Sequence, residues 1–240
     1  MPPILPIPWE DRHGPGLVRA FGRTLVLAAR HPTQFYGRCR RAASPLAAIA
    51  FGLVFELLVV SLGFVHEKLV GQAELQATLD SYGPALRKAI PQGAELIEGA
   101  LRGSALASFL CTPVSYVFEL LTTTAMTWIG LRLIRKLRTS FAVLLRAFAY
   151  ASWVRIFGLL GVTGDVFLGA LAFLLTLGFG SWAWLAAVKQ TQEIDTKSAV
   201  YASLLGGLVA FGITCVIIVP PLILLVLCAA SKIELPSIGP

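Results

Sequence analysis

The stretch PLAAIAFGLVFELLVVSLGF, residues 45–64, decides the class of this fold. It contains one charged side chain, Glu56. An α-helix rises about 1.5 Å per residue, so a run of this length matches a hydrocarbon core of about 30 Å. Because a bilayer core offers no water to backbone N–H and C=O groups, such a run must be a helix buried in lipid or in protein. The stretch therefore predicts a transmembrane helix.

Four more apolar stretches follow, and together they predict an all-α integral membrane protein, a five-transmembrane helix bundle. The predicted spans are 45–64, 105–131, 140–161, 166–188 and 198–219, the last with a kinked extension to 230. We expect an external loop at 65–104 and an external tail at 231–240. Hydrophobic residues make up 56% of the chain, charged residues 14%, and the mean hydropathy is +0.76. This composition excludes an ordinary soluble domain.

Residues 1–44 are predicted to form a cytoplasmic arm with an amphipathic helix between Pro15 and His31. At 100° per residue, its basic and apolar residues fall on different sides. The basic side holds Arg12, Arg19, Arg23 and Arg30. The apolar side holds Leu17, Phe21, Leu25 and Ala28. The pattern favours a helix lying in the membrane interface with its arginines toward headgroups. The alternative is an amphipathic helix packed on the protein's own cytoplasmic surface.

The basic residues also predict the orientation. The net charge is +7. Lipid-headgroup contacts are expected at Arg12, Arg19, Arg23, Arg30, Arg38, Arg40, Arg41, Arg132, Arg135, Lys136 and Arg138. All of these precede span one or lie between spans two and three. With Arg146, Lys189 and Lys197 they put 14 basic residues inside, against five outside. The positive-inside rule then places the N-terminus in the cytoplasm and the C-terminus outside. Anionic membrane lipids explain these charges better than nucleic acid does.

Three ionisable residues form a predicted intramembrane polar cluster: Glu56 in span one, Glu119 in span two and Arg155 in span three. Each costs about 2.5–3.5 kcal/mol at mid-membrane if it is left unpaired. We therefore expect Arg155 to pair with Glu56 or Glu119. One interpretation is a site for an ion, a proton or a lipid headgroup. The other is a structural ion pair that fixes helix registry, and one base facing two acids favours it.

Span five carries a helix-packing pattern of small residues, Ala202, Gly206 and Ala210, four positions apart. Such spacing lets helix backbones approach closely, within one chain or between copies. Packing within the chain is the default interpretation. Oligomerisation or contact with other membrane proteins is the alternative.

Enzyme signatures are absent from the sequence. The histidines, His13, His31 and His66, are scattered along the chain, so no metal site or His-based dyad is predicted. No phosphate-binding loop is present. We expect no catalytic residues and no cofactor.

Short motifs along the chain point to a family. Pro8, Trp9 and Glu10 are followed by Gly16, Ala20, Phe21 and Thr24, then by Pro32, Phe35 and Tyr36. Pro45 and Leu46 begin span one, and Tyr150, Ala151 and Ser152 lie in span three. These motifs resemble those of bacterial members of the YIP family (Ypt/Rab-interacting protein domain). One departure is the turn after span three, where the family often has a Pro that is missing beside Gly158, Gly161 and Gly164.

The resemblance implies five spans with a cytoplasmic N-terminus and an external C-terminus. From it and the residue pattern we expect a non-enzymatic adaptor or scaffold in a bacterial inner membrane. Its ligands would be lipid headgroups or partner membrane proteins. The alternative function is a lipid or ion transporter that uses the polar site between spans one to three.

Overall fold

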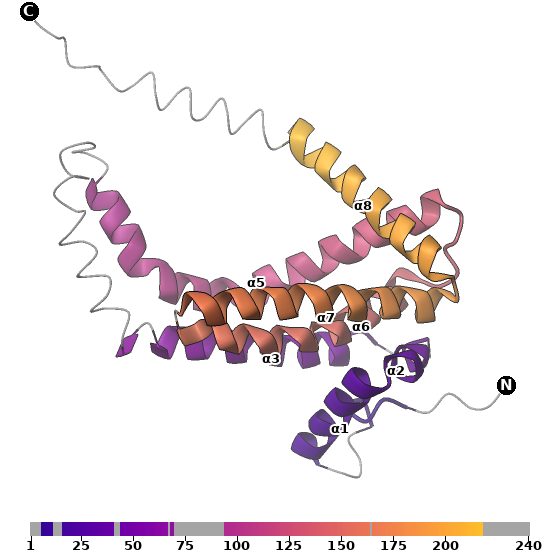
Figure 1. The fold of residues 1–240 in the computed structure, drawn as a ribbon, viewed down its shortest axis with the longest axis horizontal. Helices are drawn as coiled ribbons and strands as arrows, with labels where there is room; N and C mark the ends of the chain where they lie inside the picture. Colours follow the sequence, from indigo (N-terminus) through magenta and orange to yellow (C-terminus); the bar gives the residue numbers. More distant parts are fainter. Residues whose placement is uncertain are drawn as a thin grey trace, which may run out of the picture.

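The computed structural model describes residues 6–11, 16–40, 44–66, 68–69, 94–163 and 165–217, with side chains in α5 and α8 described at 109–133 and 196–209. Over these residues the chain is all-helical (Figure 1). The elements are α1 Leu17–Arg30, α2 Pro32–Arg38, α3 Leu46–His66, α5 Ala94–Leu133, α6 Phe141–Ala151, the 3₁₀ helix η2 Ser152–Thr163, α7 Val166–Gln192 and α8 Thr196–Ile217.

Four helical stretches are long and apolar enough to cross a bilayer, which indicates a multi-pass membrane protein. They are Leu46–His66, Phe109–Leu133, Phe141–Thr163 and Val166–Gln192, with hydropathy from 1.2 to 2.4. Large apolar side chains such as Phe118 and Phe173 point away from the protein, as lipid-facing residues do. The fifth predicted span coincides with α8, which is not among the four, and its extension to 230 lies outside the described residues.

The last part of the segment predicted as an external loop, residues 65–104, is helical. α5 begins at Ala94, whereas the stretch of α5 that is apolar enough to cross a bilayer begins at Phe109. The segment after Pro91 carries Glu95, Glu98 and Arg102 at helical spacing, so its charges suit a helix that continues into the span. The charges ended our predicted span because they end an apolar run, although they do not end a helix.

The third span, predicted at 140–161, matches the candidate span Phe141–Thr163, but its winding changes part-way along. It is α-helical only from Phe141 to Ala151 and then continues as a twelve-residue 3₁₀ helix. Runs of 3₁₀ helix longer than three or four residues are uncommon. At three residues per turn, every third side chain shares a face, and in η2 that face holds Ser152, Arg155 and Gly158.

The N-terminal arm folds against the bundle. On α1, Ala20, Thr24 and Ala28 are buried, and the Phe21 ring lies 4.9 Å from Phe51 and 5.1 Å from Phe55 of α3. The alternative of packing on the protein's own surface therefore applies to this face of α1. The arginine face of the same helix remains exposed.

The arm and two inter-helix connections gather at one end of the bundle. Figure 1 shows α1 and α2 near the end where α5 turns into α6 and α7 turns into α8. The positive-inside rule predicts the same side of the membrane for these three segments. The four candidate spans, 46–66, 109–133, 141–163 and 166–192, run in alternating directions between the two ends of the bundle.

The small residues of α8 contact α5 closely. A Cβ added at Gly206 would lie 2.1 Å from the Met126 carbonyl oxygen, and one at Gly130 of α5 would lie 1.8 Å from that of Ala202. Ala202 and Gly206 therefore pack within the chain, the default interpretation for this pattern. The side chain of Ala210 lies outside the described part of α8.

Candidate functional site

The structure brings the three intramembrane charges together. Arg155 of η2 donates from Nη1 to Oε2 of Glu56 on α3, at 2.5 Å. It donates from Nη2 to Oε1 of Glu119 on α5, also at 2.5 Å. The predicted pairing is thus present with both carboxylates instead of one. The guanidinium also lies over the Tyr116 ring, 5.4 Å from its centroid. We call Glu56, Glu119 and Arg155 the charged triad.

The 3₁₀ winding of η2 positions Arg155. Ser152, one turn earlier on the same face, accepts a hydrogen bond from the Tyr116 hydroxyl at 3.2 Å. One turn later, Gly158 leaves room for α3, since a Cβ there would lie 3.2 Å from Val59 Cγ1. On this face of η2, Ser152 therefore contacts α5, Arg155 binds the two carboxylates, and Gly158 lies against α3.

The two carboxylates of the triad differ in their surroundings. The Glu56 side chain is 21% exposed and that of Arg155 25%, whereas that of Glu119 is 61% exposed. Glu119 thus lies on the outer side of the cluster. With both carboxylates ionised, the triad carries one net negative charge.

A cavity of about 140 Å³ adjoins the triad. Glu119, Arg155, Tyr116, Ser152 and Trp184 are among the residues that line it. Charged and hydroxyl-bearing side chains therefore line this cavity within an apolar bundle, and it is large enough for several water molecules.

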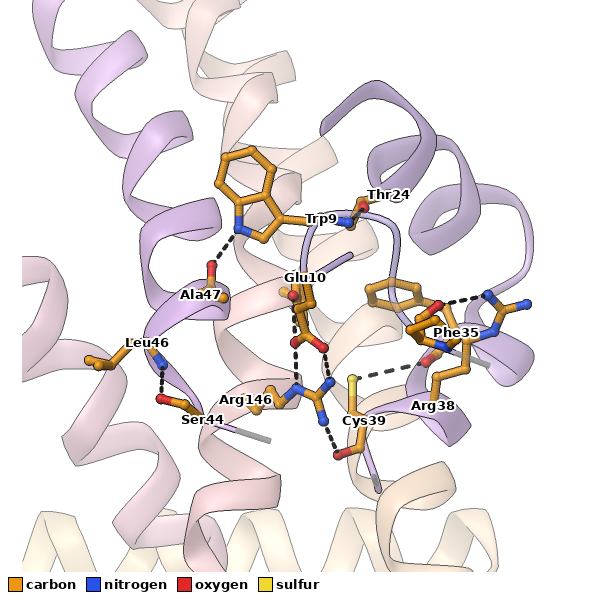
Figure 2. A network of polar contacts seen from close by, with 12 residues as sticks. Trp9, Glu10, Thr24, Phe35, Arg38, Cys39, Ser44, Leu46, Ala47 and Arg146 are labelled. Carbon is orange, nitrogen blue, oxygen red and sulfur yellow. Dashed lines mark hydrogen bonds and ion pairs between the residues drawn. The ribbon is translucent and has the colours of Figure 1, made fainter. Parts of the chain in front are cut away.

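A second polar cluster, which the sequence analysis did not predict, ties the arm to span three (Figure 2). Arg146 of α6, whose side chain is 1% exposed, forms an ion pair with Glu10, and its Nε donates to Glu10 Oε1 at 2.7 Å. Its Nη1 donates to the Cys39 carbonyl at 3.0 Å, and the Tyr150 hydroxyl donates to Glu10 Oε1 at 2.9 Å. We had counted Arg146 only as an inner basic residue. The available signal was an arginine with no acid nearby in sequence and a Pro-Trp-Glu motif upstream.

Trp9 holds the same segment from its other side. Its indole N–H donates to the Ala47 carbonyl at 2.6 Å, where α3 begins, and its backbone N–H donates to Thr24 Oγ1 at 2.9 Å. Its ring packs edge-on against Phe21 and Phe51. Residues 9 and 10 therefore contact α1, α3 and α6 at once.

Burial also suppresses the ionisation of the groups beneath the arm. Desolvation raises the pKa of the Cys39 thiol to about 12, with Arg146 opposing the shift. Desolvation likewise raises the pKa of the Tyr36 hydroxyl. Both side chains are neutral at physiological pH, so neither adds an unpaired charge to this end of the bundle.

Glu193 joins three segments at the arm end. It lies between α7 and α8, forms an ion pair with Arg40 of the arm, and lies 3.8 Å from Arg138 of the α5–α6 connection. Its φ of 50° puts it in the left-handed region, where it ends α7. Hydrogen bonding and charge from Arg40 lower its pKa. Beside it, Gln192 Oε1 accepts from the backbone N–H groups of Arg138 and Thr139, at 2.7 and 3.1 Å.

The residues predicted to contact headgroups fall into three groups. The side chains of Arg19, Arg23, Arg30, Arg132, Arg135, Lys136 and Arg138 are exposed. Two are half-buried and have partners in the protein, Arg38 with the Pro6 carbonyl at 3.5 Å and Arg40 with Glu193. Arg12 and Arg41 lie outside the described residues. In the part of the chain that the structure describes, the exposed side chains are the ones that face outward, and Arg138 of this group also lies 3.8 Å from Glu193.

Among the described residues, no three His, Cys, Asp or Glu side chains are arranged to hold a metal ion. No family model, curated protein or solved structure matches the chain. The resemblance to the YIP family therefore stays a prediction.

Proposed function

We propose that this protein is a non-enzymatic adaptor or scaffold of a bacterial inner membrane, with the topology of the YIP family. Its fifth span would be α8, its N-terminus cytoplasmic and its C-terminus external. The basic end of the bundle would bind anionic lipid headgroups or an acidic partner. Attachment of the arm to the bundle carries this proposal, because it holds the exposed arginines of α1 at the same end as those of the α5–α6 connection.

The surface of α1 supports a position in the membrane interface. Arg19, Arg23 and Arg30 lie on one side, and Val18 and Val26 are large apolar residues left 84% and 50% exposed beside them. Exposed arginines with apolar side chains beside them suit a helix at the boundary between headgroups and acyl chains. The opposite face of α1, which holds Ala20, Thr24 and Ala28, is buried against the protein.

Native mass spectrometry from nanodiscs of mixed zwitterionic and anionic lipid tests the lipid-binding part. We expect the wild-type protein to retain anionic lipid preferentially. The variant Arg19→Gln/Arg23→Gln/Arg30→Gln should lose much of this preference. The matched control Arg19→Lys/Arg23→Lys/Arg30→Lys keeps the charge and should retain it. Equal lipid retention by all three proteins would refute the proposal.

Reporter fusions test the topology. A reporter active only in the cytosol should work at the N-terminus and fail at the C-terminus of the full chain. Activity at both ends would mean an even number of spans and would remove the five-span assignment.

A lipid or ion transporter is the second candidate, and the cavity beside the charged triad favours it. Vesicles reconstituted with the protein would then move lipid or ion faster than empty vesicles. A Glu119→Gln variant should reduce that movement if the triad forms part of the path.

A further inference from the structure

The charged triad has more acid than base. One guanidinium is shared between two carboxylates, with one nitrogen donating to each. Tyr116 is the other titratable side chain that faces it, from α5, and α7 contributes Trp184, which does not titrate. The next basic side chain along the span, Arg146, is engaged by Glu10. Among the described residues, therefore, nothing balances the second carboxylate.

An uncompensated carboxylate within a membrane span is unfavourable, and a bound cation or proton removes the charge. The Glu119 side chain is 61% exposed and that of Glu56 is 21% exposed. Glu119 is therefore the outer carboxylate and has fewer protein groups around it. It also lines the cavity, which has space for water beside it.

We propose that the triad is a proton-binding site, in which Glu119 takes up one exchangeable proton through the adjoining cavity. Protonated Glu119 keeps one oxygen as acceptor for Arg155, and Glu56 remains the ionised partner. The site then switches between a neutral and a singly negative state within the membrane. This inference does not depend on the lipid-binding proposal, because it concerns a different region of the bundle.

A lipid-soluble carbodiimide tests the proposal on the full-length protein in vesicles. The reagent adds only to a protonated carboxyl group, whose proton moves to a carbodiimide nitrogen as the oxygen bonds to its carbon. Peptide mass spectrometry should find the adduct at Glu119, with a yield that falls as pH rises. Asp165, at the start of α7, faces solvent and should not react.

Variants separate a proton site from an unspecific one. In Glu56→Gln one guanidinium faces one carboxylate, so the triad has no excess negative charge for a proton to remove, and labelling of Glu119 should fall about tenfold or more. In Arg155→Gln labelling of Glu119 should rise. Absence of labelling at Glu119 at every pH, or equal labelling in Glu56→Gln, would overturn the proposal. Protection by Na⁺ at constant pH would also overturn it, since the ligand would then be a metal cation.

Infrared difference spectroscopy between the wild-type protein and Glu119→Gln provides a second check, because every carboxyl group of the chain absorbs. The difference should contain a carbonyl band of a protonated carboxylic acid that disappears reversibly as pH rises. A spectrum without such a titrating band would rule out the exchangeable proton.

Discussion

Glu10 and Arg146 form an ion pair although 136 positions separate them in the chain. The pair lies where the arm meets span three, with the Arg146 side chain 1% exposed. A buried charge depends on its partner, because water does not replace the lost interaction. This contact therefore helps to hold the arm on the bundle, together with the contacts of Trp9 and Phe21.

Replacing Glu10 by Gln should destabilise the protein by about 3–5 kcal/mol, since it removes the carboxylate that pairs with a buried guanidinium. Denaturant titration in detergent would measure the loss, and limited proteolysis should cut the arm faster. The exposed Arg30→Gln is the control and should change little. Removing both charges in Glu10→Met/Arg146→Met should cost less than the single change. A Glu10→Gln variant as stable as wild type would contradict the role assigned to the pair.

Cys39 reports whether the arm is docked. Because burial raises the pKa of its thiol to about 12 from 9.0, the reactive thiolate is scarce at neutral pH and the group is also shielded. In a background with Cys111, Cys215 and Cys228 changed to Ser, we expect slow alkylation of Cys39 by a water-soluble maleimide. Glu10→Gln should accelerate it at least several-fold. Fast alkylation of the parent protein would mean that the arm is not held as described.

The glycine pair of α8 gives a test with a built-in control. Gly206→Ala would place a Cβ 2.1 Å from the Met126 carbonyl oxygen, so α5 and α8 must move apart, at a cost of about 1–3 kcal/mol. Gly207→Ala meets nothing within 4 Å and should be neutral or stabilising by up to about 1 kcal/mol. Thermal unfolding in detergent would compare them. Equal melting temperatures would argue against the close crossing.

The ion pair of Glu193 with Arg40 should stabilise the protein less as the pH falls. Arg40 lowers its pKa below the ordinary value of 4.5, so the folded state holds the proton less tightly than the unfolded state. The contribution is therefore complete above pH 4.5 and disappears as pH falls through the lowered value. Glu193→Gln should melt slightly below wild type at pH 6, and the difference should shrink toward pH 3. A difference that is constant with pH would exclude this ion pair as its cause.

The sequence predicted the spans because their signal is local. A run such as 45–64 needs no tertiary contact to show that it is apolar over a bilayer thickness, and α3 covers Leu46–His66. The ends of elements were harder, because hydropathy marks where lipid stops while a helix such as α5 continues beyond it. The pairing of Arg155 was predictable for a similar reason, since an isolated charge within a span demands a partner.

The Glu10–Arg146 contact could not be predicted in the same way. Arg146 lies near the end of an apolar run, where a free arginine reaching headgroups is an equally good explanation. Only the folded arm places Glu10 next to it. The 3₁₀ winding of η2 was equally hidden, because no single residue between Ser152 and Thr163 requires it. Both features depend on long-range packing.

The winding of η2 sets the direction in which the side chains of span three point. An α-helix advances about 100° per residue and a 3₁₀ helix about 120°, so rewinding the segment would turn Arg155 by about 60° relative to Ser152. The hydrogen bond of Ser152 and the two ion pairs of Arg155 would then compete for one orientation of the helix. A change that favours α-helical winding across 152–163 would therefore give up either that hydrogen bond or the ion pairs.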